Sequence, residues 1–245
     1  MVVMRKYLYE THMHTSEVSA CASTSGAKQA RIYKELGYDG IIVTDHFYNG
    51  NTAISRNMPW EKWVNNFTRG YENAKKEGDK IGLSVFFGWE ESFQGNDFLV
   101  YGLDKEWLLN HPEILEWSIE EHYEQIKAAG GYFVHAHPYR EAGYISRIRL
   151  FPEHVDAVEV INSSHINPKF DRRARAYAAN HKLVVTAGSD SHHDGDLRGG
   201  ILFEQKLDTI QDFIRLMKSG ARVELVRDAR DLGYDSKRVS YGLKG

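Results

Sequence analysis

Residues 40–46 read GIIVTDH, a short β-branched strand that ends directly in an acid and a histidine. Similar apolar runs recur along the chain and alternate with longer helical patterns. Runs that are continuously apolar, rather than alternating, are typical of a parallel sheet covered by helices. The predicted strands are Tyr7–Thr11, Gly40–Thr44, Leu83–Gly88, Phe98–Tyr101, Tyr132–His135, Ala157–Ile161, Leu183–Ala187 and Gly200–Phe203.

Helical spacing of apolar residues marks the segments between these strands. The predicted helices are Gly26–Leu36, Trp60–Lys76, Ser118–Ala129, Pro168–Asn180 and Leu207–Ser219. About seven β/α units predict one α/β domain over residues 1–245, a distorted (β/α)7 TIM-like barrel, with a doubly wound open sheet as the alternative. Residues 221–245 form a C-terminal extension in which RVELV is a predicted strand.

Composition excludes several classes of function. The 31 Lys and Arg residues against 34 Asp and Glu give a formal charge of −3, so we expect no nucleic-acid partner. No apolar run reaches the roughly 20 residues of a membrane span, and the first ten residues lack the apolar core of a signal peptide. The single Cys21 makes no internal disulfide, which favours a reducing compartment. We therefore expect a cytoplasmic protein; its oligomeric state is not predicted.

The twelve histidines are unevenly placed. The C-terminal ends of barrel strands form the catalytic face, and seven histidines lie at such ends: His12, His14, His46, His135, His137, His192 and His193. Acids join them there, namely Asp45, Glu90, Glu91, Asp97 and Asp190. The other five stand in helical or loop contexts, where solvated or capping roles are expected: His111, His122, His154, His165 and His181.

Gathered imidazoles and carboxylates predict bound metal ions, because such a cluster of titratable groups is otherwise costly. The spacing of His12 and His14 directs both side chains to one face of a strand. Imidazole and carboxylate ligands without thiolate suit Zn, Mn or Fe. One catalytic zinc takes three protein ligands, so eight or more candidates indicate two or three divalent ions.

Four motifs in order make the sequence similar to the PHP (polymerase and histidinol phosphatase) family of metal-dependent phosphoesterases. They are ETHMHT (10–15), GWE (88–90), GGYFVHAHPYR (130–140) and GSDSH (188–192), with GIIVTDH between the first two. The similarity spans about residues 7–203 and implies a distorted seven-stranded barrel that typically holds three metals.

The resemblance also implies the ligands of two neighbouring metals. The first metal would be held by His12, His14, Glu90 and Asp190. Glu90 would bridge to a second metal, which His137 also binds. The family usually supplies a further histidine to this second site, and Asp97 in DFLVYG occupies the matching position.

A third metal would use His46 and His192 with one residue after the first motif. The family often has HTxxSDG or a further histidine there, whereas this chain reads HTSEVSACAS (14–23). Glu17 is the preferred substitute and Cys21 the second choice.

The predicted reaction is hydrolysis of a phosphomonoester of a small metabolite, as in histidinol phosphatases, by attack of a metal-bridged hydroxide. Arg140 and Arg198 are candidates for bidentate phosphate contacts, with surface ion pairs to neighbouring acids as the alternative. A protonated His135 or His193 is the candidate general acid. The loops 47–59 and 139–151 are predicted to roof the substrate pocket.

Two alternatives remain from the sequence. One is an amidohydrolase-type hydrolase of an amide or lactone, although no lysine stands at the central strand ends, which carry Glu90 and His137. The other is a non-catalytic or nuclease-like module related to polymerase PHP domains.

Overall fold

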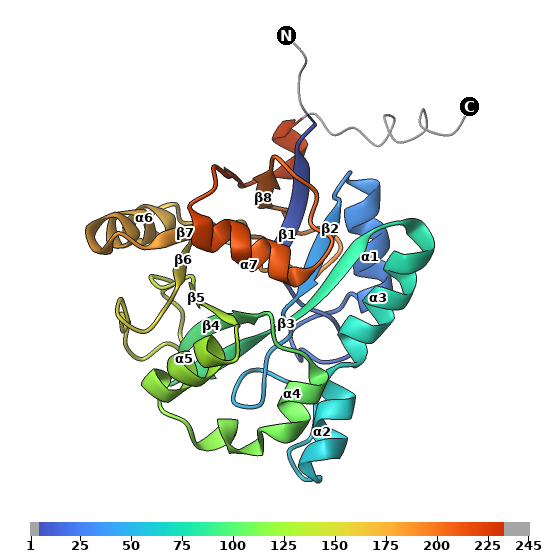
Figure 1. Ribbon diagram of the computed structural model, residues 1–245, viewed down its shortest axis with the longest axis vertical. Coiled ribbons are helices and arrows are strands. Elements are labelled where there is room, and N and C mark those ends of the chain that lie inside the picture. Colours follow the sequence, from blue (N-terminus) through green and yellow to red (C-terminus); the bar gives the residue numbers. More distant parts are fainter. Residues whose placement is uncertain (1–4, 233–245) are drawn as a thin grey trace.

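The computed structural model describes residues 5–232, within which nine strands form a nearly closed barrel in the order β7-β6-β5-β4-β3-β2-β1-β8-β9 (Figure 1). The strands are β1 Tyr7–Met13, β2 Gly40–Val43, β3 Ser84–Phe93, β4 Asn96–Tyr101, β5 Tyr132–Ala136, β6 Ala157–Asn162, β7 Val184–Gly188, β8 Gly200–Phe203 and β9 Glu224–Val226. The predicted single-domain α/β barrel is thereby confirmed.

The sheet is mixed rather than fully parallel. Strands β1, β2 and β3 pair in parallel, as do β5, β6 and β7. Strand β4 is antiparallel to both its neighbours, because the two-residue turn Gln94–Gly95, with positive φ at both residues, joins it directly to β3. So short a turn connects only antiparallel strands. Strand β8 also runs antiparallel to β1, so the expected parallel sheet is wrong at β4 and β8.

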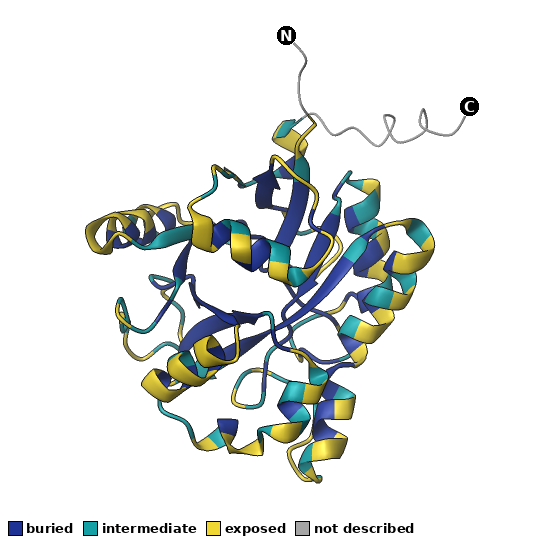
Figure 2. Cartoon of the chain, in the orientation of Figure 1, coloured by how far each residue is buried: buried dark blue, intermediate teal, exposed yellow. Residues whose placement is uncertain are grey.

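The helices are α1 Gly26–Glu35, α2 Trp60–Phe67, α3 Arg69–Ile81, α4 Lys105–Asn110, α5 Ile119–Ala128, α6 Lys169–His181 and α7 Ile210–Ser219, with 3-10 turns at Pro112–Glu116 and Ala229–Leu232. Figure 2 shows that they direct their exposed faces outward, around the buried strands. The helix expected over Trp60–Lys76 is two helices that meet at Thr68, and α4 was not expected. Strand β9 confirms the strand predicted in the C-terminal extension, of which residues 233–245 lie outside the described part.

Helix α7 covers one end of the barrel (Figure 1). Its residue Phe213 packs against Tyr101 and Tyr132, with ring centroids 5.3 and 6.3 Å away. Tyr132 begins β5 and Tyr101 ends the antiparallel β4, so α7 covers the rim at which the parallel strands start. The opposite rim, where those strands end, is left free for a site.

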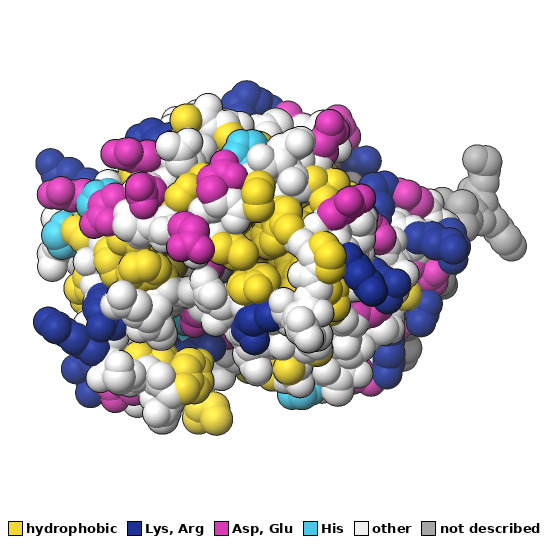
Figure 3. Space-filling model, turned by 90° about the horizontal axis from the view of Figure 1, so that it is seen from below, with side chains coloured by type: hydrophobic (Ala, Val, Ile, Leu, Met, Phe, Trp, Pro, Cys, Tyr) yellow, Lys and Arg dark blue, Asp and Glu magenta, His cyan; other side chains and the backbone are white. Residues whose placement is uncertain are grey.

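The surface carries charges of both signs. Figure 3 shows acidic and basic side chains interspersed on one face, around a group of hydrophobic side chains. This mixture agrees with the net charge of −3. Within residues 5–232, no helix combines the length and apolar character that crossing a membrane requires.

The close packing of α1 on α3 generates a stability prediction. A Cβ added at Gly26 would lie 2.2 Å from the carbonyl oxygen of Gly70, far inside van der Waals contact. We expect Gly26→Ala to lower the free energy of unfolding by about 1–3 kcal/mol, as overpacking typically does. The control is Gly143→Ala, because a Cβ there meets nothing within 4 Å. Equilibrium urea unfolding of both variants provides the test, and equal stabilities would contradict this packing.

Candidate metal centre

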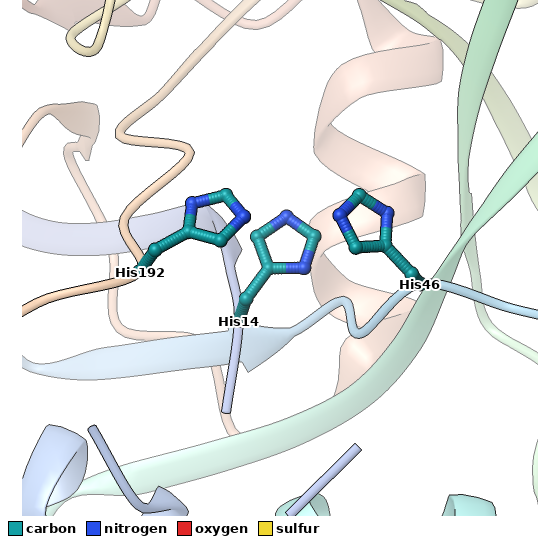
Figure 4. A group of neighbouring side chains, drawn as sticks. All are labelled: His14, His46 and His192. Carbon is teal, nitrogen blue, oxygen red and sulfur yellow. The ribbon is translucent and has the colours of Figure 1, made fainter. Parts of the chain in front are cut away.

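Seven candidate ligands, carried by five strands or by the residues that directly follow them, converge on the free rim of the barrel. They form three groups, and within each group the ligand atoms lie within 4.8 Å of one another. The groups are His12–His14–Asp190, His12–Glu90–His137 and His14–His46–His192, the last of which is shown in Figure 4. Because His12 and His14 each belong to two groups, the three groups adjoin and form one centre.

Two of these candidate ligands have backbone conformations that residues other than glycine rarely adopt. The φ angle is 28° at His137 and 53° at Asp190. Such strain costs of order 1–3 kcal/mol and persists where the surroundings hold it, often at functional sites. Here the His137 amide donates to Glu159 Oε2 at 3.1 Å, and the Asp190 amide donates to the His12 carbonyl at 2.7 Å. The fold therefore fixes both side chains in place before anything binds.

Glu90 belongs to one of the three groups, and its two oxygens also lie close to histidines of the other two. Its Oε1 lies 3.3 Å from His12 Nε2 and 3.2 Å from His137 Nε2. Its Oε2 lies 3.5 Å from His14 Nε2 and 2.7 Å from His46 Nδ1. Burial disfavours the charged form, but the charges of His46 and His12 outweigh burial and hold the pKa of Glu90 well below its usual range.

The ring orientations of His12 and His14 fit a cation. Their Nε2 atoms face each other at 3.3 Å. His12 Nδ1 lies 2.9 Å from Glu159 Oε1 and His14 Nδ1 lies 3.1 Å from Ser19 Oγ. In the neutral tautomer that carries its proton on Nδ1, each ring would direct an Nε2 lone pair at the same place, as metal-ligating histidines require. Asp190 Oδ1 completes this group, 3.2 Å from His14 Nε2.

Buried polar atoms that lack hydrogen-bond partners are a second feature that a bound metal ion would satisfy. His46 Nδ1 and Glu90 Oε2 are buried and have no hydrogen-bond partner, although they lie only 2.7 Å apart. Burial, together with the charges of His46 and His192, holds the pKa of His14 well below its usual range. A neutral imidazole beside unsatisfied carboxylate oxygen is the donor set that Zn, Mn or Fe prefers.

The structure favours Cys21 over Glu17 at the third group. Both Glu17 carboxylate oxygens accept from the Gly26 amide, at 2.9 and 3.2 Å, and Oε1 also accepts from Asn73, so this side chain caps α1 instead of reaching the cluster. Burial raises the pKa of the Cys21 thiol, but contacts with His192 and His46 outweigh it and lower the pKa to about 6. The Cys21 thiol therefore lies beside these two rings and lines the same cavity, but it is not part of the His14–His46–His192 group, so its role as a ligand stays a prediction.

Asp97 lies at the edge of the centre, outside the three groups. It is buried on β4 and accepts from Ser92 Oγ at 2.6 Å. Burial and the neighbouring Glu90 charge raise its pKa, while His137 acts in the opposite direction. Asp97 therefore lies near the Glu90–His137 pair, and its role as a ligand of the second metal stays a prediction.

Arg140 contacts the ligand cluster and also lines an open cavity. Its guanidinium donates to Asp190, to Ser164 Oγ at 2.9 Å and to His165 Nε2 at 3.3 Å. A cavity of about 490 Å³ is lined by Arg140, Asp190 and His192. Arg140 is thus positioned to meet an anion beside the cluster.

Arg198, the other predicted phosphate contact, has a different role. Its buried guanidinium donates to the carbonyls of His193 at 2.7 Å and Asp196 at 2.8 Å, and lies 5.2 Å from the centre of the Tyr33 ring. These contacts are internal, so Arg198 holds the turn that follows His192. His193 lies exposed at the cavity, with Nδ1 2.8 Å from Ser23 Oγ.

His135 is not brought to the cluster, contrary to its expected place among the strand-end histidines and as a general acid. Its ring stacks on Phe98, with centroids 4.8 Å apart, and lies 6.3 Å from Tyr177 of α6, outside the barrel. The left-handed backbone at His137 breaks the strand alternation that would have placed the two rings together. Burial and His137 lower the pKa of His135 to about 3, which does not suit a general acid near neutral pH.

Two residues of the site were not predicted from the sequence, and one predicted feature is only partly present. Glu159 on β6 is buried and fixes His12, and an acid inside the apolar run AVEVI was the available signal. His165, expected in an ordinary loop, is buried beside Arg140 with Nδ1 2.7 Å from Asp171 Oδ1. The loops 47–59 and 139–151 were both expected to cover the pocket. The loop 47–59 instead packs on α2 through Phe47, and none of its residues lines the cavity.

Comparison with solved structures shows where this fold occurs. A two-domain protein from Bacteroides vulgatus that contains a predicted PHP-like metal-dependent phosphoesterase has a TM-score of 0.61 and 15% identity; the match covers 90% of this chain and 64% of that chain. PsfC from Pseudomonas syringae has a TM-score of 0.60 and 17% identity, over 98% and 100% of the two chains. An amidohydrolase from Chromobacterium violaceum, solved with sulfate and no metal, has a TM-score of 0.57 and 15% identity, over 91% and 99%.

No protein-family model and no curated protein matches the sequence. The structural similarity establishes the fold: the chain has the barrel of PHP-like metal-dependent phosphoesterases. The buried His, Glu and Asp groups on its rim are consistent with metal binding.

The contact between Glu159 and His12 generates a prediction about metal affinity. Glu159→Gln keeps the shape of the side chain but removes the charge that orients the ring of His12, so we expect metal affinity to fall about 10–100-fold. Isothermal titration with Zn or Mn measures the change. The control is Glu91→Gln, a neighbouring buried carboxylate that pairs with His122 instead. Equal affinities of Glu159→Gln and the wild type would refute this role.

The choice between Cys21 and Glu17 has a spectroscopic test. Co(II)-loaded protein is expected to show a sulfur-to-metal charge-transfer band in the near ultraviolet, because a thiolate ligand donates charge to the ion. Cys21→Ser should remove the band and Glu17→Gln should keep it. A band that survives Cys21→Ser, or is absent from the wild type, would exclude Cys21 as a ligand.

Proposed function

We propose that this protein is a metal-dependent phosphomonoesterase that hydrolyses a small phosphorylated metabolite. The observation that carries the proposal is the adjoining arrangement of the three ligand groups around Glu90. Adjacent divalent ions in such an arrangement supply charge neutralisation for a phosphoryl group and lower the pKa of bound water. The remaining steps depend on side chains of this chain.

Arg140 binds the phosphoryl group of the substrate in this proposal. Its guanidinium lines the cavity beside Asp190, and a planar fork of donors matches phosphate oxygens. Ser164 and His165 each contact the guanidinium and hold its plane. The ester oxygen would then face the cavity, which His192 and His193 also line.

Glu159 and Glu10 keep the ligands in position throughout. Glu159 accepts from the His12 ring, and Glu10 accepts from the His12 amide at 2.8 Å and the Ser189 amide at 2.9 Å. Glu159 therefore ties β1 to β6, and Glu10 ties β1 to Ser189 after β7, which limits movement of the candidate ligands.

An amide or lactone hydrolase is the second candidate, because one similar structure is described as an amidohydrolase. The lysine expected at a central strand end of that family is missing from the buried polar residues of the described part of the chain. The arginine in the cavity suits an anionic substrate. Both observations support the phosphomonoesterase.

The proposed function is tested by phosphate release from an aryl phosphate and from histidinol phosphate, with Mn, Zn or Fe added in turn. We expect metal-dependent turnover, and Arg140→Lys should lower kcat/KM roughly 10–100-fold, because lysine loses the planar fork. Arg173→Lys is the control, since Arg173 pairs with Glu141 on the surface.

His12→Ala excludes a contaminating phosphatase, because loss of a ligand shared by two groups should abolish turnover. No phosphate release with any of these metals, or equal release by His12→Ala, would overturn the proposed function. Hydrolysis of a cyclic amide or lactone in place of the phosphate esters would favour the second candidate.

A further inference from the structure

Exposed apolar side chains gather around the cavity. Four large hydrophobic residues of the described chain are exposed: Tyr144, Leu150, Ile166 and Leu197. Of these, Ile166 and Leu197 line the cavity over the cluster, and Tyr144 lies next to Arg140. Ile166 is 99% exposed. Apolar groups exposed around a concave site often mark a binding surface.

The buried part of the cavity lining is polar, whereas its exposed part combines Ile166 and Leu197 with Ser164 and His193. Asp190, His192 and Arg140 also line the cavity, and the proposed function places the phosphoryl group beside them. The volume of about 490 Å³ falls within the range of small-molecule sites, so it holds more than a phosphate. A group attached to the phosphate would then extend toward the exposed lining residues Ile166 and Leu197.

The polar residues of the same cavity are largely committed to internal hydrogen bonds. Ser163 Oγ donates to the Arg227 carbonyl at 2.6 Å. Asp196 Oδ2 accepts from the His192 and His193 amides, at 2.6 and 2.7 Å. A polyhydroxylated group finds few free partners there, and its hydroxyls would lose hydrogen bonds with water.

We propose that the substrate class of this site is a phosphomonoester whose alcohol carries an apolar group, aromatic or branched aliphatic, that packs on Ile166 and Leu197. This inference rests on the proposed function and specifies its substrate. Burial of the apolar group stabilises the complex, whereas a compact polyol phosphate gains nothing from these side chains.

The test compares 2-phenylethyl phosphate with glycerol 1-phosphate on the metal-loaded protein. Both esters release an alkanol, so their intrinsic reactivities are similar. A difference in kcat/KM between them therefore measures how the protein recognises the group attached to the phosphate. We expect kcat/KM to be at least about tenfold higher for 2-phenylethyl phosphate, on the scale of burying one apolar side chain. Calorimetric titration with 2-phenylethylphosphonate and inorganic phosphate should show the same preference in binding.

Serine variants test whether Ile166 and Leu197 cause the preference for 2-phenylethyl phosphate. Ile166→Ser and Leu197→Ser should each reduce the ratio of kcat/KM for 2-phenylethyl phosphate to kcat/KM for glycerol 1-phosphate about threefold or more. Both side chains are exposed in the wild type, so both variants should fold. Leu150→Ser is a closely matched control, because Leu150 is 39% exposed and Leu197 is 38% exposed, yet only Leu197 lines the cavity.

The outcomes are distinct. If both esters are hydrolysed equally well and the serine variants match Leu150→Ser, the inference is overturned while the proposed function stands. If neither ester nor an aryl phosphate is hydrolysed with Mn, Zn or Fe, the proposed function fails and this inference fails with it.

Discussion

The Glu90 carboxylate is the feature on which the rim of this barrel depends. Four imidazoles approach its two oxygens, those of His12, His14, His46 and His137. Buried charge of this density is costly unless it is compensated. Divalent cations between the rings and the carboxylate would compensate it, which links the fold to the proposed chemistry.

The rest of the rim holds these groups in place. Asp45 accepts from the Thr15 amide at 2.6 Å and from Ser19 Oγ at 2.7 Å, so it fixes the turn after β1 although it belongs to no ligand group. A Cβ on Gly70 would collide with Thr15 and Asp45, so α3 packs directly against this turn. Helix packing therefore positions the candidate ligands. The exposed side chains Ile166 and Leu197, which line the cavity, lie outside this packed part of the rim.

Much of this was predictable from the sequence because residue type and strand position are both visible there. The motifs predicted that His12, Glu90 and Asp190 meet, and the structure brings them together. The direction of β4 was not predictable from apolar pattern, since the turn Gln94–Gly95 decides it. The choice between Cys21 and Glu17 depended equally on how a short loop folds, which composition does not encode.

If one carboxylate organises several ions, the number of metal ions that each chain binds depends on Glu90. Dialysis of the full chain to equilibrium against Mn or Zn, followed by elemental analysis, should give two or three ions in each wild-type chain. Glu90→Ala should lose at least one of them, because Glu90 lies against ligands of all three groups. No bound metal in the wild type, or an unchanged count in Glu90→Ala, would contradict the account.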